Sequence, residues 1–291
     1  MVDREVLGGK MKVLAGTPEL REIILAAKRG GLKVGLVPTM GALHEGHASL
    51  IRAAKINCDF LVVSIFVNPK QFGPAEDYNA YPRDLKKDLD LILPHGVDVV
   101  FTPEPAVMFP SGFSSNVEVD GGISEALCGK SRPGHFAGVA TVVAKLFNLA
   151  QPDIAFFGAK DYQQQLIIKK MTVDLNFPVE IVTLPTIREQ DGLAMSSRNA
   201  YLRPEERRAA GVIFKALQLA REEFKEKSPW EMKRRLKVFI ENEPLAKIDY
   251  LELVDPETLT EATDGHKKVL VAAAVFVGKT RLIDNMVIEK K

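Results

Sequence analysis

Strand-like and helix-like segments alternate along the first 185 residues, and this alternation constrains the fold more than any other feature of the sequence. The clearest strand is FLVVSIFV, residues 60–67, whose almost continuous apolar run is typical of a strand covered on both faces of a parallel sheet. We expect further strands at residues 33–37, 97–101, 154–157 and 179–184. We expect helices at residues 46–57, 82–93, 136–150 and 162–175, after a first helix that Thr17 caps and Pro18 begins.

Strands that alternate with helices predict an α/β fold with a Rossmann-like, doubly wound parallel sheet. The alternation stops near residue 185, where charged amphipathic helices (204–227 and 229–241) and two more strands (248–254 and 269–277) follow. We therefore predict a catalytic domain of residues 1–185. A smaller C-terminal α+β domain, residues 186–291, is expected to hinge around residues 187–199 and close over the site.

Composition and charge exclude several classes of protein. The chain of 291 residues is 46% hydrophobic and carries a formal net charge of +1, so no basic surface for nucleic acid is predicted. No apolar run approaches the roughly 20 residues that span a bilayer, and the N-terminus lacks the apolar core of a secretion signal. Two cysteines without CxxC spacing suit a reducing compartment. We expect a cytoplasmic protein without membrane or nucleic-acid partners.

The densest motif is PTMGALHEGH, residues 38–47, at the turn from a strand into a helix. Ligands of such sheets bind outside the carboxyl ends of the strands, where this turn lies. Gly41 and Gly46 permit close backbone approach, and the helix N-terminus is expected to offer free N–H groups to an anion. His44 and His47 can donate hydrogen bonds to phosphate oxygens and to charge on leaving pyrophosphate. The alternative is that both histidines only cap the helix.

Other interpretations of this motif fit less well. His-Glu-Gly-His superficially resembles the zinc motif H-E-x-x-H, but its histidines are three residues apart, it begins in a loop, and no third ligand is evident. The chain has neither G-x-x-x-x-G-K-[ST] nor G-x-G-x-x-G, which argues against P-loop kinases and ordinary dehydrogenases.

The His-x-Gly-His turn after a strand resembles the nucleotidyltransferase superfamily that includes class I aminoacyl-tRNA synthetases. Further motifs narrow the resemblance, and in order they are VPTMGALHEGH (37–47), VSIFVNPKQF (63–72), YPRD (81–84), SRPGHFAGV (131–139), FFGAKDYQQ (156–164), DGLAMSSRN (191–199) and RLIDN (281–285). In identity, order and spacing they resemble the pantothenate synthetases, or pantoate–β-alanine ligases, over nearly the whole chain. The resemblance implies ATP-dependent condensation of pantoate with β-alanine through a pantoyl-adenylate. Another nucleotidyltransferase of the superfamily is the alternative.

The resemblance also implies site residues. His44, His47, Lys160 and Arg198 are expected to be catalytic, since a lysine or arginine can neutralise charge that builds on phosphates. The expected ATP contacts are Met40, Gly41, Ala42, Leu43, His44, Glu45, Gly46, His47, Gly158, Ala159, Lys160, Asp161, Ile187, Met195, Ser196, Ser197 and Arg198. Gln71 and Gln164 are expected to bind pantoate, with Gln71 beside the β-alanine site.

Three expectations remain open at this stage. Mg²⁺ is expected to accompany ATP, and although acidic residues near residues 81–84, Asp88 above all, are possible ligands, no metal ligand is assigned. Arg132 and His135 either line the acid-binding pocket or order their loop. The resemblance further implies a homodimer that takes ATP, pantoate and β-alanine as small-molecule substrates.

Overall fold

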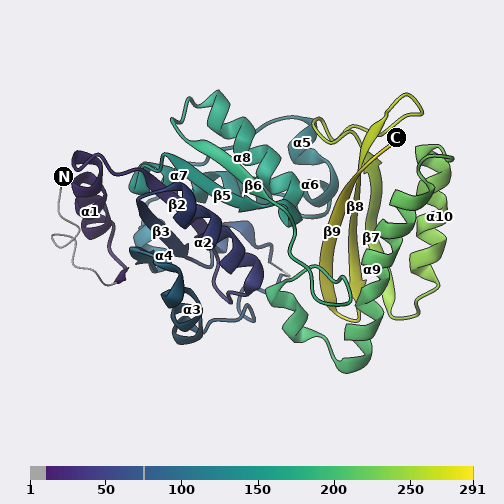
Figure 1. Ribbon diagram of the computed structural model, residues 1–291, viewed down its shortest axis with the longest axis horizontal. Coiled ribbons are helices and arrows are strands. Elements are labelled where there is room, and N and C mark those ends of the chain that lie inside the picture. Colours follow the sequence, from purple (N-terminus) through teal and green to yellow (C-terminus); the bar gives the residue numbers. More distant parts are fainter. Residues whose placement is uncertain (1–10, 75, 291) are drawn as a thin grey trace. The chain divides into compact units, whose positions relative to one another are not determined.

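The computed structural model describes residues 11–74 and 76–290 (Figure 1). Its contacts divide the chain into two compact units. The first unit holds the described residues up to Val119 together with Gly134–Ala159 and Ile167–Pro185, and the second holds Asp120–Pro133, Lys160–Leu166 and Thr186–Lys291 as far as it is described. The chain passes from the first unit into the second after Pro185, and two earlier segments also belong to the second. Residues 1–10, part of the segment judged to lack a secretion signal, lie outside the described residues.

The first unit is built on a parallel sheet, as the alternating pattern predicts. In the part of the chain that is described, its strands lie in the order β1 (Lys12–Leu14), β4 (Val99–Phe101), β3 (Phe60–Ile65), β2 (Val34–Thr39), β5 (Ile154–Gly158) and β6 (Glu180–Leu184). Every pairing is parallel. The central strands are buried on both faces, which explains why they read as continuous apolar runs.

The helices of the first unit follow the strands. They are α1 (Thr17–Arg29), α2 (Glu45–Asn57), α3 (Leu85–Ile92), α4 (Pro105–Met108) and α7 (His135–Ala150), with the short 3₁₀ helices η2 (Pro69–Gln71) and η3 (Leu93–His95). α2 packs its apolar residues with those of β2, β3 and β5 in one core. α7 is buried on nearly all sides, as expected from its apolar sequence HFAGVATVVAKLFNLA.

The order of the strands locates the switch point of the sheet. From β2 the chain proceeds to β3 and β4 on one side of the sheet, whereas β5 and β6 extend the other side. The direction of winding therefore reverses between β2 and β5, and ligands of such sheets bind at this switch point, beyond the carboxyl ends of the strands. Thr39, Ile65 and Gly158 end β2, β3 and β5. The motifs that follow them therefore begin at one edge of the sheet.

The second unit contains an antiparallel sheet of β7 (Ala246–Val254), β8 (Lys268–Val277) and β9 (Thr280–Glu289). Helices α9 (Pro204–Glu223) and α10 (Pro229–Glu241) run along this sheet (Figure 1). On β8, the odd-numbered residues from 269 to 277 pack with these helices, whereas Leu270 and Ala272 pack with the segment of α5 (Gly122–Glu125) and α6 (Leu127–Ser131). β8 is thus buried on both faces, which accounts for its continuous apolar sequence.

Several sequence expectations need correction. Thr17 does not cap α1, because Gly16 occupies the cap position without a side-chain hydrogen bond. The strand expected at 60–67 ends at Ile65, and the helix expected at 82–93 is α3 followed by η3. Strands β1 and β9 lie outside the sequence expectations. β8 and β9 form a hairpin closed by the turn at Gly278, which has a φ of 59°.

Candidate functional site

The turn that leads from β2 into α2 is left-handed at two successive residues. Gly41 has a φ of 81° and Ala42 a φ of 50°, a conformation that an L-residue such as alanine adopts only at a cost. Thr39 Oγ1 accepts a hydrogen bond from the Gly41 N–H at 3.2 Å and donates to the Ser64 carbonyl at 2.7 Å. Thr39 therefore ties the turn to the end of the neighbouring strand β3.

Backbone N–H groups of this turn are not free, which corrects the sequence expectation. The Ala42 and Leu43 N–H groups donate to the two carboxylate oxygens of Asp88, at 3.0 and 2.7 Å. The His44 N–H donates to His47 Nδ1 at 3.3 Å, and the Gly46 N–H to His44 Nδ1 at 3.1 Å. Because these donors are used inside the protein, they hold the turn in shape and are not available to an anion.

The two histidines form a capping box at the start of α2, as the capping alternative requires. Each Nδ1 accepts a hydrogen bond from a backbone N–H, so in each neutral ring the proton resides on Nε2. Their ring centroids lie 4.2 Å apart. Capping thus uses the Nδ1 atoms, and the donor group of each neutral ring is the Nε2–H.

The remaining residues of this motif have separate partners. Glu45 forms an ion pair with Arg52, seven residues further along α2, and this hydrogen bond is the largest cause that lowers the pKa of the Glu45 carboxyl. Asp88 lies on α3 with 3% of its surface exposed. Burial raises the pKa of the Asp88 carboxyl, while the hydrogen bonds from Leu43 and Ala42 lower it in part.

Gln71 lies beyond the carboxyl end of β3, as expected, and is buried against the same turn. Its Nε2 contacts Met40 Sδ at 2.8 Å, and its Oε1 accepts a hydrogen bond from Asn68 Nδ2 at 3.1 Å. His135 Nδ1 lies 2.7 Å from the Gln71 carbonyl oxygen. The His135 ring therefore contacts the backbone of the η2 segment.

A glycine in α7 allows this segment to lie where it does. A Cβ at Gly138 would lie 2.2 Å from the Lys70 carbonyl oxygen, so only glycine permits η2 to approach α7 this closely. The Gly138 carbonyl also accepts a hydrogen bond from Asn68 Nδ2 at 3.0 Å. Asn68 thus links Gln71 to α7, a positioning role that its own place in the motif does not reveal.

Lys160 lies in the 3₁₀ turn η4 (Ala159–Asp161), directly after β5 and before α8 (Tyr162–Asp174). Its Nζ is 3.7 Å from Asp161 Oδ1, and 20% of its side chain is exposed. Asn285 Nδ2 donates to the Lys160 carbonyl at 2.8 Å. The C-terminal RLIDN motif therefore fixes the backbone of Lys160, a contact across 125 residues that local sequence reasoning missed.

The segment that contains Ile187 and residues 195–198 folds back on itself. Met195 N–H donates to the Ile187 carbonyl at 3.0 Å, and Arg188 and Ala194 form an antiparallel bridge. Ser196 caps the 3₁₀ helix η5 (Ser197–Tyr201) by accepting the Arg198 N–H at 3.3 Å. Ser197 and Arg198 lie half-buried in that helix.

A glycine shapes the bend of this segment. Gly192 has a φ of 92°, and a Cβ there would lie 1.9 Å from the Phe214 ring of α9. Both the left-handed backbone and the close approach to the ring therefore require glycine at this position.

Arg188 anchors this segment to β9. It donates to both carboxylate oxygens of Asp284, at 2.6 and 3.0 Å, and to the Gly192 carbonyl at 3.0 Å. Burial raises the pKa of the Asp284 carboxyl, and the hydrogen bonds from Arg188 lower it in part. Asp284 and Asn285 are adjacent, so the middle of β9 positions both Lys160 and the 187–198 segment within the second unit.

Gln163 and Gln164, the first two of three glutamines at the start of α8, differ in their surroundings. Gln163, which the sequence did not single out, is buried and holds the segment around α5 and α6: its Oε1 accepts the Cys128 N–H at 3.0 Å and its Nε2 donates to the Ile123 and Ala126 carbonyls. The expected pantoate ligand Gln164 is half-buried. In this way Gln163 supports the helix turn that presents Gln164.

The structure thus brings together the expected residues in two groups. In the first unit, Met40 contacts Gln71 beside the 41–47 turn. In the second unit, β9 connects Lys160 with the segment of Ile187, Met195 and Arg198. Gly158, the last residue of β5, and Ala159 belong to the first unit. The next two residues of the chain, Lys160 and Asp161, belong to the second unit.

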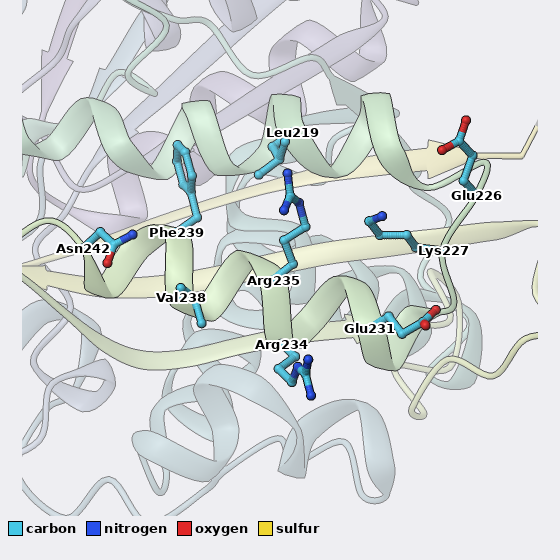
Figure 2. A pocket seen from close by; sticks show the side chains of 9 residues that line it. All are labelled: Leu219, Glu226, Lys227, Glu231, Arg234, Arg235, Val238, Phe239 and Asn242. Carbon is cyan, nitrogen blue, oxygen red and sulfur yellow. The ribbon is translucent and has the colours of Figure 1, made fainter.

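One hollow in the second unit is lined by none of the expected site residues. A groove of about 530 Å³ lies between α9 and α10 (Figure 2), where Leu219 of α9 faces Arg235 and Phe239 of α10. Over residues 11–74 and 76–290, no three His, Cys, Asp or Glu side chains are grouped to hold a metal ion. Nor does any described helix have the length and apolar character needed to cross a membrane.

Comparisons with known proteins agree over almost the full chain. A family model described as "Pantoate-beta-alanine ligase" matches residues 12–287. A pantothenate synthetase from Carboxydothermus hydrogenoformans is 52% identical over 281 residues, covering 96% of this chain and 99% of the relative. The crystal structure of pantothenate synthetase from Thermus thermophilus matches with a TM-score of 0.89 at 46% identity, covering 95% of this chain and 99% of that one.

A further solved structure carries ligands. The pantoate-beta-alanine ligase from Francisella tularensis, solved in complex with beta-gamma ATP and beta-alanine, matches with a TM-score of 0.80 at 35% identity, covering 95% of this chain and 97% of that one.

Proposed function

The chain belongs to the pantoate–β-alanine ligase family, and from this premise we propose how its own residues perform the ATP-dependent joining of pantoate to β-alanine. The observation that carries the proposal is the pair of imidazoles at the carboxyl end of β2. Backbone N–H groups fix both Nδ1 atoms, so both rings carry an Nε2–H donor at the switch point of the sheet.

In the first step, a carboxylate oxygen of pantoate attacks the α-phosphorus of ATP. The bond from that phosphorus to the bridging oxygen breaks, and pyrophosphate leaves with the electron pair, so that pantoyl-adenylate forms. Negative charge rises on the α-phosphate and on the leaving group during this step. Preorganised donors and fixed positive charges stabilise such a transition state without reorganisation.

We assign this stabilisation to the Nε2–H groups of His44 and His47 and to the cations of Lys160 and Arg198. The imidazoles are suited to it because the capping box fixes both rings. Asn285 supports Lys160 through the backbone, and the Ser196 cap supports Arg198. The other ATP contacts that we propose are Gly158, Ala159, Asp161, Ile187, Met195 and Ser197.

In the second step, the uncharged amine of β-alanine attacks the carbonyl carbon of the mixed anhydride. An amide bond forms, AMP leaves with the electron pair, and the amine loses a proton. No covalent bond to the protein is needed, so the protein contributes positioning, charge stabilisation and exclusion of water.

Gln71 and Gln164 are our proposed pantoate contacts. An amide offers both donors and an acceptor, which suits a small acid that carries hydroxyl groups. Gln71 is supported by Asn68 and Met40, so its amide is held at the edge of the sheet where the histidines lie. Gln164 is supported by the hydrogen bonds of its neighbour Gln163.

We propose that Mg²⁺ enters with ATP and not in a site built by the protein. Asp88, whose carboxylate contacts the histidine turn, uses each oxygen to accept a backbone N–H. Magnesium commonly binds through substrate phosphates and water, where it neutralises phosphate charge.

Assembly and location are further parts of the proposal. We propose a homodimer in the cytoplasm, on the strength of the resemblance to the family and of two buried free cysteines that suit a reducing compartment. Sedimentation equilibrium across a range of protein concentrations tests the dimer, and a mass equal to one chain throughout would contradict it.

The identity of the nucleotide product tests the proposed reaction. The chain is incubated with ATP, Mg²⁺, pantoate and β-alanine, and the nucleotides are separated by chromatography. We expect AMP and pyrophosphate in equal amounts with the amide product, and no turnover when pantoate is omitted. Formation of ADP and phosphate would instead indicate attack at the γ-phosphorus, and a retained nucleotidyl product without β-alanine dependence would indicate another nucleotidyltransferase.

A further inference from the structure

Asp88 is distant in sequence from the histidine turn but is in direct contact with it. Its two carboxylate oxygens accept the N–H groups of Ala42 and Leu43, at 3.0 and 2.7 Å, and the side chain is almost fully buried. No other part of the proposed reaction uses this carboxylate. A buried carboxylate whose two oxygens accept hydrogen bonds from two adjacent backbone N–H groups fixes the position and orientation of that backbone.

The backbone that Asp88 holds is a strained one. The non-glycine residue Ala42 has a φ of 50°, and strain of this kind persists only where the surroundings determine the conformation from several sides. Thr39 holds the Gly41 N–H from β2, and Asp88 holds the next two N–H groups from α3. The fit is close, since a Cβ at Gly41 would lie 3.0 Å from Asp88 Oδ2.

His44 follows this turn directly, and His47 is tied to it through the His44 N–H. A shift of the 41–43 backbone therefore moves both imidazoles. We propose that Asp88 is a positioning residue for adenylate formation, which holds the turn at residues 41–43 so that the Nε2–H groups of His44 and His47 are aligned. This inference rests on the proposed function and adds to it a residue whose carboxylate orders the turn at residues 41–43.

The structure offers a matched control on the same helix. Asp84 is exposed and caps α3, where its Oδ1 accepts the Lys87 N–H at 3.0 Å. Asp84→Ala thus removes an aspartate that accepts a backbone N–H in α3 without touching the histidine turn. Asp88→Asn keeps the shape of the side chain but turns an NH₂ group toward one of the two N–H donors, so at least one of these hydrogen bonds is lost.

The test measures pantoate-dependent exchange of labelled pyrophosphate into ATP at saturating substrates, together with hydrogen exchange of the backbone amides. For Asp88→Asn we expect the pyrophosphate exchange rate to fall about 10- to 100-fold, because small displacements of catalytic groups are costly. The apparent KM for ATP should change much less. The amides of Ala42 and Leu43 should exchange faster with solvent. Asp84→Ala should leave the rate and both amides as in the wild type.

Three results would each overturn the positioning role. The first is a wild-type rate of pyrophosphate exchange in Asp88→Asn, and the second is an equal loss of that rate in Asp84→Ala. The third is recovery of the Asp88→Asn rate at high Mg²⁺ concentration, which would indicate that Asp88 is a metal ligand. If Asp88→Asn does not fold, Asp88→Glu replaces it, because glutamate keeps the charge but displaces the oxygens by one methylene, and the same losses are expected. A wild-type chain without pantoate-dependent exchange would contradict the proposed function itself, whereas the three results above leave it standing.

Discussion

At the scale of single residues, the two ring nitrogens of His47 have different roles. Its Nδ1 accepts the His44 N–H as part of the cap of α2, and its Nε2–H is the donor that we assign to the reaction. The side chain of asparagine ends at the position of Nδ1, whereas that of glutamine reaches the position of Nε2. The two substitutions therefore separate the cap from the donor.

For His47→Asn we expect single-turnover adenylate formation at saturating ATP to slow by roughly 10²–10³-fold, as for loss of one preorganised donor. ATP binding should weaken far less. His47→Gln should retain more activity, although it lacks the cap. His266→Ala, in the second unit and outside the proposed site, serves as the control. A near-normal rate in a folded His47→Asn protein would reduce His47 to a structural cap.

The position of a residue can be predicted from sequence when it depends on the element that contains it. It cannot be predicted when it depends on a partner far away along the chain. The positions of the 40–47 turn and of Gln71 in the chain were predictable because each follows a strand of the parallel sheet, and the ends of parallel strands lie at one edge of that sheet. Asp88 and Asn285 act on residues 46 and 125 positions away. Nothing in their local pattern indicates these contacts, which depend on how the strands and helices pack.

At the scale of elements, α9 braces the segment of residues 187–199. Arg207 of α9 donates to both carboxylate oxygens of Asp191, at 2.6 and 3.0 Å, and to Glu189 at 2.6 Å. Glu189 also accepts a hydrogen bond from Asn199 at 2.7 Å. The segment that carries Arg198 is thereby tied to a long helix at several points, so its backbone is preorganised.

This brace predicts a pH dependence. The hydrogen bond from Arg207 is the main cause that lowers the pKa of the Asp191 carboxyl. A lowered folded-state pKa gives stability that is present above the unfolded value of about 3.9 and is lost as the pH falls through the folded value. Arg207→Gln should therefore lower the Tm at pH 7, and its difference from the wild type should shrink toward pH 3.

Arg208→Gln is the control for this prediction, because Arg208 is the exposed neighbour of Arg207 in α9. The measurement is thermal unfolding at several pH values for all three proteins. A Tm difference between Arg207→Gln and the wild type that stays constant from pH 7 to pH 3 would contradict the assignment of the brace to this ion pair.

The elements themselves were predictable where a periodic pattern was long enough. β3 and α7 follow directly from apolar sequence, but β1 has three residues and too little pattern to identify. β9 alternates buried and half-buried residues, yet Asp284 occupies one of the buried positions. A charge there breaks the expected apolar alternation, and only the distant Arg188 explains how it is accommodated.

At the scale of the whole molecule, each compact unit contains one buried thiol. Cys58 lies in the first unit and Cys128 in the second. Burial raises the pKa of the Cys58 thiol to about 11, so only about one such thiol in a thousand is ionised at pH 8. Cys128 Sγ lies 3.2 Å from the hydroxyl of Tyr250 in β7.

We therefore expect both cysteines to resist a thiol reagent at pH 8 until the unit that contains them opens, because the thiolate is the reactive form. Cys58→Ser and Cys128→Ser each leave one thiol, so labelling in increasing urea follows the opening of one unit at a time. Complete labelling of either variant within minutes in the absence of urea would contradict the burial described above.

The central claim is that the chain forms pantoyl-adenylate before any amine is present. The most direct measurement supplies ATP, Mg²⁺, pantoate and ³²P-labelled pyrophosphate, leaves out β-alanine, and follows the label into ATP. We predict exchange that requires pantoate and that is strongly reduced in His47→Asn. If no label enters ATP while the same preparation joins pantoate to β-alanine when all three substrates are present, the adenylate mechanism is contradicted.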